Sequence, residues 1–356
     1  MPGLVVIVPH QTRDQNKIVL NVDCSFGNPL ASNIVPDSNL RYCLPEQKVS
    51  ICVYIVIHVS PSRLRQSRLE MMVDLQAVSQ KDSVNSIMTG WVVNIPQSDT
   101  LLQARDIMSQ RRVSQLVVID EKTRPVGLIS KRDLARFLME DSTNRGLEEI
   151  SVSEASCKST PEIRQDLPVF NAARLFDIEN LACAIVTNEH PFIGIVTETD
   201  LCNYFSRRIP NTFRVSEFMA SDFIFAKSSY PVVHVAQAIV FKQPSVPVID
   251  DELIGILTLS DLLSIGQKTP DTIQHHLAFN SANRKEVAML TTRDLMTRNP
   301  VSVKQDDDLA QAAQTIIRKG IGSLPVLDNE GTVVGLLSKH DIVRALGRVG
   351  KPLDLD

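Results

Sequence analysis

Residues Val334–Ile342 read Val-Gly-Leu-Leu-Ser-Lys-His-Asp-Ile, an apolar run that ends in a hydroxyl residue and is followed three positions later by an aspartate. The same pattern, here called the hydroxyl–aspartate phrase, recurs at Val126–Leu134, Ile193–Leu201 and Ile254–Leu262. Each copy predicts a short strand that runs directly into the first turn of a helix. Because internal repetition is the signature of repeat architectures, the phrase divides the chain into four units.

A second landmark, the opening phrase, precedes three of these copies at a nearly constant distance. It reads Ser-Ile-Met-Thr at 86–89, Glu-Phe-Met-Ala at 217–220 and Asp-Leu-Met-Thr at 294–297. Met88, Met219 and Met296 lie 45, 42 and 45 residues before the aspartates of their units. In the second unit, Ala155 holds the methionine position, again 45 residues before Asp200. Two landmarks at a nearly fixed separation indicate a true domain repeat.

The landmarks predict a domain division in which units of about 60 residues are each too small to be stable alone and therefore pair. The expected ranges are an N-terminal segment at 1–82 that is unassigned or poorly ordered, repeat 1 at 83–148, repeat 2 at 149–210, repeat 3 at 211–268, a linker at 269–291 and repeat 4 at 292–349. Strand-like runs within 1–82 leave open a small accessory β unit.

Repeat 1 illustrates the secondary structure that the pattern predicts. Leu101–Ser109 carries apolar residues at helical spacing, and Leu116–Asp120 and Val126–Ile129 are short apolar runs typical of strands. Leu134–Leu138 continues a helix after the second strand. The order predicts an α/β fold of mixed sheets covered by helices, repeated four times.

Composition limits the possible classes of function. The chain has 356 residues, 43% hydrophobic residues and a net charge of −4, which argues against nucleic acid as its main partner. Its longest apolar run, Val49–Val59, is too short to cross a bilayer as a helix, which takes about 20 residues. The six cysteines show no Cys-x-x-Cys pattern, so we expect reduced thiols, a cytoplasmic location and no metal site.

The hydroxyl and aspartate of each phrase have two possible roles. Ser/Thr-x-x-Asp at the start of a helix is a capping box, in which hydroxyl and carboxylate satisfy free backbone N–H groups. The same groups at a cleft suit a nucleoside or nucleotide, because a helix N-terminus favours phosphate and a carboxylate accepts hydrogen bonds from ribose hydroxyls. The spacing alone leaves both roles open.

The two patterns together resemble the CBS domain, named after cystathionine β-synthase. The resemblance lies in Gly-h-h-Ser/Thr-x-x-Asp-Leu/Ile, where h is an apolar residue, preceded by h-x-x-h-Pro-Val-h-Asp. Repeat 4 fits best, with Ile321–Asp328, and repeat 3 is close, with Ser245–Asp250. Repeat 1 has Val117 in place of the proline, and repeat 2 has neither the proline nor the methionine. The resemblance covers about 83–349.

The resemblance implies two CBS pairs, also called Bateman modules, that bind AMP, ADP, ATP or S-adenosylmethionine in their clefts. It assigns ribose hydroxyls to four aspartates, namely Asp133, Asp200, Asp261 and Asp341. It places four hydroxyls near phosphate or sugar, namely Ser130, Thr197, Thr258 and Ser338. The base is expected against Val113–Leu116 and the strand-entry residues Ile321, Gly322, Ser323, Leu324 and Pro325. Four side chains are candidates to meet phosphates or to form a solvated helix face, namely Lys131, Arg132, Lys339 and His340.

Catalysis is not expected, because the chain contains no G-x-S-x-G, P-loop or H-E-x-x-H motif. We predict a regulatory protein that senses an adenosyl ligand, needs no cofactor, and acts on an unidentified partner or on its own assembly. Pairing of the repeats is compatible with packing inside one chain or with a homodimer, and we favour the homodimer. The alternative is a non-catalytic interaction scaffold with empty clefts, in which the phrases serve only as helix caps.

Overall fold

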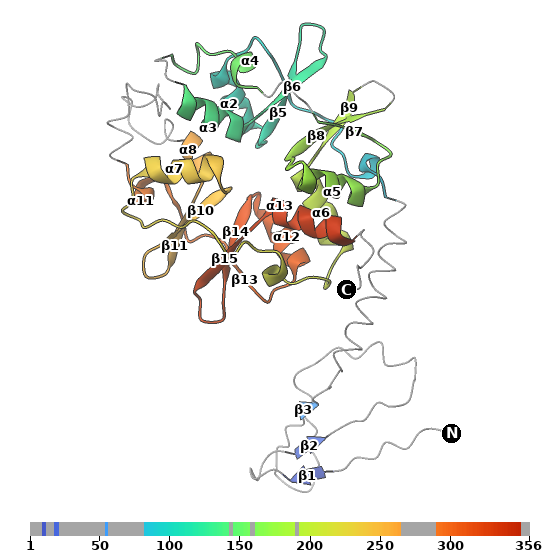
Figure 1. Cartoon of the computed structure of the whole chain (residues 1–356), viewed down its shortest axis with the longest axis vertical. Helices are drawn as coiled ribbons and strands as arrows, with labels where there is room; N and C mark the ends of the chain where they lie inside the picture. Colours follow the sequence, from blue (N-terminus) through green and yellow to red (C-terminus); the bar gives the residue numbers. More distant parts are fainter. Residues whose placement is uncertain are drawn as a thin grey trace. The chain divides into compact units, whose positions relative to one another are not determined.

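The structure, a computed structural model, describes residues 82–141, 145–156, 161–188, 192–264 and 290–349, together with three short strands nearer the N-terminus (Figure 1). The chain divides into two compact units, Met1–Glu70 and Met71–Asp356. In the first unit, β1 (Pro9–Gln11) pairs antiparallel with β2 (Ile18–Leu20), which pairs parallel with β3 (Tyr54–Ile55). Most of the predicted segment 1–82 and of the predicted linker 269–291 lies outside the described residues.

The first two repeats follow the predicted order of short helix, strand, helix, strand, strand and helix. Repeat 1 contains η2 (Val84–Ser86), β4 (Asn94–Pro96), α2 (Leu101–Gln110), β5 (Gln115–Ile119), β6 (Pro125–Ser130) and α3 (Lys131–Glu140). Repeat 2 contains α4 (Val152–Ala155), β7 (Glu162–Arg164), α5 (Val169–Ile178), β8 (Cys183–Thr187), β9 (Phe192–Thr197) and α6 (Glu198–Arg208). In both, the first strand runs parallel to the second and the third runs antiparallel.

The last two repeats follow the same order, except that the first strand of repeat 3 is reduced to a single parallel bridge between Ala226 and Val248. Repeat 3 contains η3 (Val215–Glu217), α7 (Val232–Phe241), β10 (Ser245–Ile249), β11 (Leu253–Thr258) and α8 (Leu259–Leu263). Repeat 4 contains α11 (Thr292–Leu295), β12 (Thr297–Arg298), β13 (Val303–Lys304), α12 (Leu309–Lys319), β14 (Ser323–Leu327), β15 (Val333–Ser338) and α13 (Lys339–Val349). The predicted α/β fold of four small mixed sheets is confirmed.

Each repeat begins with an opening segment, which consists of η2, α4, η3 or α11 and the residues that follow it. This segment packs on the other repeat of the same pair. A backbone N–H at the start of each segment donates to a carbonyl just before the first long helix of the partner repeat. The four bonds are Val84 to Leu167 at 2.9 Å, Val152 to Asp99 at 2.7 Å, Val215 to Asp307 at 3.0 Å and Thr292 to Tyr230 at 2.8 Å. Val84, Val152, Val215 and Thr292 are each 0% exposed. Repeats 1 and 2 therefore form one pair, and repeats 3 and 4 form the other.

The ends of three opening segments lie along the strand of the partner's hydroxyl–aspartate phrase. Thr89 pairs with Ile195 of β9, and its N–H and C=O groups make hydrogen bonds of 2.8 and 3.0 Å to that residue. Ala220 pairs with Leu336 of β15 in the same way. Thr297 of β12 pairs with Ile256 of β11.

The glycine of the phrase makes room for this contact. A Cβ at Gly194 would lie 2.7 Å from the carbonyl oxygen of Thr89 and 3.3 Å from Sδ of Met88. A Cβ at Gly335 would lie 2.7 Å from Sδ of Met219, and the equivalent Cβ at Gly255 would meet the methionine side chain of the repeat 4 opening phrase. The opening phrase of one repeat thus contacts the hydroxyl–aspartate phrase of its partner repeat, which the sequence alone does not show.

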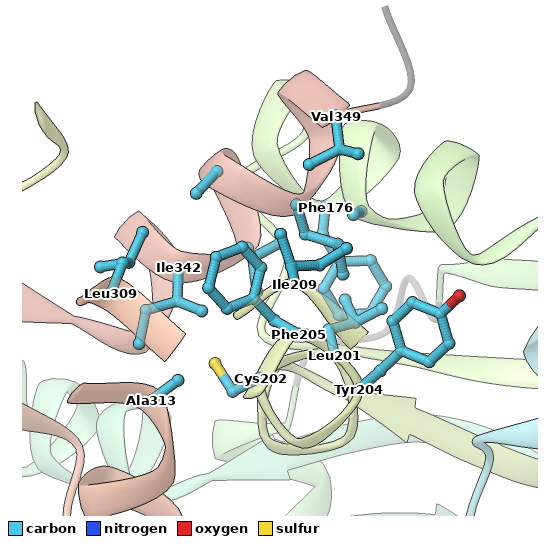
Figure 2. Close-up of a cluster of buried hydrophobic side chains, with 14 of the residues drawn as sticks. Phe176, Leu201, Cys202, Tyr204, Phe205, Ile209, Leu309, Ala313, Ile342 and Val349 are labelled. Atoms are coloured by element: carbon cyan, nitrogen blue, oxygen red, sulfur yellow. The ribbon is translucent and has the colours of Figure 1, made fainter. Parts of the chain in front are cut away.

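The two pairs pack against each other through helices inside one chain (Figure 1). α3 of repeat 1 packs on α7 and α8 of repeat 3, while α5 and α6 of repeat 2 pack on α12 and α13 of repeat 4. One core joins repeats 1 and 3, and another joins repeats 2 and 4. Figure 2 shows the second core, where Phe176, Phe205 and Ile342 are each 0% exposed. The packing that we expected between two chains is thus formed within one chain, and a homodimer stays a prediction.

We expect Gly194→Ala to destabilise the protein by about 1–3 kcal/mol, because the added methyl group overlaps the backbone of Thr89 at the pair contact. Chemical denaturation of the full chain measures this loss. Gly90→Ala is the matched control, since the nearest atom to its Cβ lies 4.0 Å away. Equal stability of the two variants would contradict the proposed role of Gly194.

Candidate functional site

All four hydroxyl–aspartate phrases form the predicted capping box. In each, one carboxylate oxygen, Oδ2, accepts a hydrogen bond from the backbone N–H of the hydroxyl residue and a second from its side chain. The N–H bonds are 2.8–2.9 Å and the hydroxyl bonds 2.6–2.7 Å long in the pairs Ser130–Asp133, Thr197–Asp200, Thr258–Asp261 and Ser338–Asp341. The carboxylate therefore serves the helix through one oxygen, and its other oxygen, Oδ1, is not used by the cap.

The carboxylates are held in partly dry surroundings. Asp261 and Asp341 are 8% and 7% exposed. Burial raises the pKa of Asp200 above its ordinary value, although hydrogen bonds from Thr197 and Thr89 act in the opposite direction. A buried carboxylate gains from further hydrogen-bond donors, and a ribose diol offers two.

Two lysines at equivalent positions reach across the contact between the two pairs. Nζ of Lys131, the first residue of α3, donates to Oγ of Ser260 in repeat 3 at 3.2 Å. Nζ of Lys339, the first residue of α13, donates to Oγ1 of Thr199 in repeat 2 at 2.9 Å. Both lysines thus contact the residue that directly precedes an aspartate of another repeat.

The positive charge of Lys339 acts on Lys131 across this contact. The pKa of Lys131 is lowered by burial and further by the positive charge of Lys339. Within the described ranges, no carboxylate forms an ion pair with either lysine. Two partly desolvated cations without a carboxylate partner are the electrostatic setting that favours an anion.

A recess lies beside Lys131, between repeats 1 and 3. Its volume is ≈ 380 Å³, including its opening to solvent, and Arg105, Lys131 and Ser260 line it together with apolar side chains of α2 and α8. The recess places polar groups from two pairs around one space.

Glu198 connects the basic residues on the other side of the contact. Its Oε1 lies 3.1 Å from Nδ1 of His340, while Nε2 of His340 lies 3.5 Å from Oδ1 of Asp177. Its negative charge also acts on Arg132, whose pKa is lowered overall by burial. Hydrogen bonding to Glu198 raises the pKa of His340 above 6.5. His340 thus links repeat 4 to two helices of repeat 2.

The predicted strand-entry residues have different surroundings. Leu324 is 0% exposed and packs in the core shared by repeats 2 and 4, so we leave its side chain out of the proposed site. Pro325 is buried in β14. Ser323 is 6% exposed, and its Oγ lies 2.5 Å from Oγ of Ser245 in repeat 3. Ile321 is half-buried and Gly322 is exposed, so these two remain accessible to a ligand.

Several contacts of the site were not predicted from the sequence. Thr89 and Thr297 each direct a hydroxyl at Oδ1 of an aspartate in the partner repeat, and Arg344 forms an ion pair with Asp341. The threonines belong to the opening phrase, but only the exchange of opening segments places them beside an aspartate. The ion pair of Arg344 could have been predicted from the sequence, because Arg344 lies three residues after Asp341 on the same helix face.

Other kinds of site are not indicated in the described part of the chain. It contains no cluster of three or more His, Cys, Asp or Glu residues that could hold a metal ion. Its helices include none long and apolar enough to cross a membrane. Cys183 and Cys202 are buried free thiols, and burial raises the pKa of Cys183 to about 12, which keeps it protonated.

Comparison with known families identifies the class. The CBS domain family matches residues 84–140, 152–207, 215–268 and 293–348, which together make up more than half of the sequence. The chain belongs to the CBS domain family and contains four tandem CBS domains. The predicted resemblance is confirmed.

Two archaeal proteins share this architecture. MJ1225 of Methanocaldococcus jannaschii is 22% identical over 273 residues, covering 71% of this chain and 94% of MJ1225. Its crystal structure, presented as that of a proposed archaeal homologue of γ-AMPK, has a TM-score of 0.66 at 20% identity and covers 74% of this chain and 99% of MJ1225. An uncharacterized conserved protein from Pyrococcus horikoshii has a TM-score of 0.53 at 17% identity and covers 74% of this chain and 100% of that one. These similarities show the fold.

A shorter relative has a known ligand. Chloroplastic CBSX2 of Arabidopsis thaliana is 29% identical over 118 residues, covering 29% of this chain and 50% of CBSX2. A crystal structure of CBSX2 is described as a complex with AMP.

The bridge formed by His340 predicts a pH-dependent contribution to stability. Because hydrogen bonding to Glu198 raises the pKa of His340, the contribution is complete below about pH 6.5 and is lost as the pH rises through the higher pKa of the folded state. We expect His340→Gln to remove about 0.5–1 kcal/mol at pH 6, and less than that at pH 9. Thermal unfolding across this range measures the difference from wild type.

His234→Gln is the control for this experiment, since His234 is exposed on α7. Its effect on the melting temperature should not depend on pH in this way. A His340→Gln effect that is constant from pH 6 to pH 9 would exclude a charged bridge.

Proposed function

We propose that this protein is a non-catalytic regulator that binds an adenine nucleotide in the clefts of its CBS pairs. The observation that carries this proposal is that Lys131 and Lys339 both reach across the contact between pairs, each from a helix start with a capped aspartate. Carboxylate oxygens suit the ribose diol, and the lysines suit phosphate. Binding would then change the free energy of the contact between the two pairs, and so modulate a partner or the assembly of the protein.

Electrostatics favour a nucleotide over S-adenosylmethionine. AMP, ADP and ATP bring negative charge to the two repelling lysines, whereas S-adenosylmethionine brings a sulfonium cation. Negative charge on the ligand offsets the positive charge of Lys131 and Lys339, and this gain is larger in a partly buried site than in water. We therefore rank the phosphorylated ligands first among the adenosyl compounds.

The alternative function is an interaction scaffold with empty clefts. It is supported by the capping boxes, because Oδ2 of all four aspartates already has two hydrogen bonds within the protein. A scaffold would use the hydroxyl–aspartate phrases only for stability. Ligand binding that depends on a phrase aspartate distinguishes the two functions.

We expect Asp133→Ala to reduce the stabilisation of the full chain by AMP. In wild type, a ligand at about one hundred times its dissociation constant adds roughly 2.7 kcal/mol. Without ligand, loss of the cap should cost about 0.5–2 kcal/mol. Thermal-shift assays with AMP, ATP and S-adenosylmethionine, and with GMP as the base control, measure both quantities.

Asp294→Ala is the matched control, because Asp294 forms a capping box of the same geometry outside the proposed site. Its Oδ2 accepts from the N–H and hydroxyl of Thr291 at 2.8 and 2.7 Å. This variant should lose similar stability and keep the full AMP effect. If Asp133→Ala also keeps the full AMP effect, the aspartate of repeat 1 is a cap alone and the scaffold is favoured.

Lys131→Met should have opposite effects on stability and on binding. Removing one of two repelling cations should leave the unliganded protein as stable as wild type or more so. Loss of a charge-assisted contact worth about 1.5–3 kcal/mol should weaken ATP binding about tenfold or more, with adenosine binding unchanged. Calorimetric titration tests this, with Lys304→Met on exposed β13 as the control. Equal loss of ATP and adenosine binding would count against phosphate recognition by Lys131.

A further inference from the structure

The free oxygen of the phrase aspartate, Oδ1, has a regular partner in repeats 2 and 3. Oγ1 of Thr89 lies 3.5 Å from Oδ1 of Asp200, and Oγ1 of Thr297 lies 3.2 Å from Oδ1 of Asp261. Both threonines come from the opening segment of the partner repeat and pair with the strand residue two positions before the phrase hydroxyl. A neutral hydroxyl beside Oδ1 is a weak contact that a ribose hydroxyl can replace.

Repeat 4 lacks this threonine. Ala220 occupies the equivalent position and pairs with Leu336, so this position offers no hydroxyl to Oδ1 of Asp341. Nη2 of Arg344 instead donates to Oδ1 of Asp341 at 2.8 Å and to the carbonyl oxygen of Phe218 at 2.7 Å. The guanidinium thus joins the opening segment to the aspartate in place of the threonine.

Repeat 1 contains the same local sequence in a different arrangement. Ser130–Arg136 reads SKRDLAR and Ser338–Arg344 reads SKHDIVR, so each aspartate is followed three residues later by an arginine. The guanidinium of Arg136 lies over the ring of Phe241, 5.9 Å from its centroid. Among the described residues, none donates a hydrogen bond to Oδ1 of Asp133. The same side-chain types therefore pair with Oδ1 of the aspartate in repeat 4 and, among the described residues, leave Oδ1 without a donor in repeat 1.

The ion pair in repeat 4 is partly shielded from water. The side chain of Asp341 is 10% exposed and that of Arg344 is 34% exposed. A charge-assisted hydrogen bond from a guanidinium is roughly twice as strong as one from a neutral hydroxyl. A ribose diol therefore competes at a disadvantage for Asp341, and at no such disadvantage for Asp133.

We propose that Arg344 is an internal competitor that keeps the carboxylate of repeat 4 closed to the ribose of a ligand. This inference rests on the proposed binding of adenine nucleotides and assigns the clefts an order. Repeat 1 takes the nucleotide first, and repeat 4 takes it only when Arg344 leaves Asp341. Arg344 also donates a hydrogen bond to the carbonyl oxygen of Phe218, in the opening segment of repeat 3. When Arg344 leaves Asp341, this contact between repeats 3 and 4 weakens, so nucleotide binding at repeat 4 is coupled to the contact within the second pair.

Equilibrium dialysis and calorimetric titration of the full chain with AMP test this order. We expect Arg344→Gln to raise the number of AMP molecules bound per chain, or to tighten the weakest class of sites at least fivefold. Arg136→Gln, the matched control in repeat 1, should leave the isotherm unchanged. Adding Asp341→Asn to Arg344→Gln should abolish the gain, because the released carboxylate is the group that binds.

A second variant protects the test against misfolding. Arg344→Lys keeps the positive charge, but one ammonium replaces the planar fork that contacts both Asp341 and Phe218, so a smaller gain is expected. Unchanged AMP binding in both Arg344 variants overturns the inference, and so does weaker binding, since Arg344 would then be a contact to the ligand. Absence of AMP binding in wild type and in every variant overturns the proposed function itself. If wild type binds AMP in a way that depends on Asp133, and the Arg344 variants bind AMP as wild type does, only the inference is overturned.

Discussion

The strand of each hydroxyl–aspartate phrase has one edge whose backbone N–H and C=O groups need partners, and much of the structure depends on how this need is met. Opening segments of the partner repeats pair with β9, β11 and β15. Buried backbone groups without hydrogen bonds are costly, so a repeat separated from its partner loses both strand pairing and the helix contact made by the opening segment. The folding unit is therefore the pair, although the sequence repeat is the single domain.

The exchange also determines where the polar groups gather. It fixes the two sheets of a pair relative to each other, which leaves the apolar helix faces of one pair to pack on those of the other. The helices that carry Lys131 and Lys339 begin at this contact, so their first residues reach neighbouring repeats. Desolvation and the like charge of the two lysines make this placement unfavourable, and the packing of the pairs does not require lysines there. That cost is the physical reason to regard the region as a binding site rather than as ordinary polar surface.

The sequence predicted the parts that depend on local pattern. The helix predicted at Leu101–Ser109 is α2, which ends one residue later at Gln110, and the strands and capping boxes of the repeated phrase follow from residues that are close in the sequence. The exchange of opening segments was not predictable, because the two landmarks of one repeat show no local sign that they belong to different sheets. The packing of the pairs within one chain depends on helix faces whose partners are more than one hundred residues away. Leu324 shows the same limit. It is a strand-entry position near the expected base, but it is also a core position in a strand whose first four residues are all buried.

The capping and the binding role of the phrase are not exclusive, because a carboxylate has two oxygens. Oδ2 stabilises the helix start in every repeat, so selection for stability alone would keep the phrase in all four. Oδ1 takes no part in the cap, and its surroundings differ between repeats. A threonine hydroxyl faces it in repeats 2 and 3, and an arginine in repeat 4. Caps of equal geometry would not require these differences, whereas clefts of unequal affinity would. The proposed difference in affinity between the clefts therefore rests on the variation around Oδ1, while the local structure around Oδ2 is shared by all four repeats.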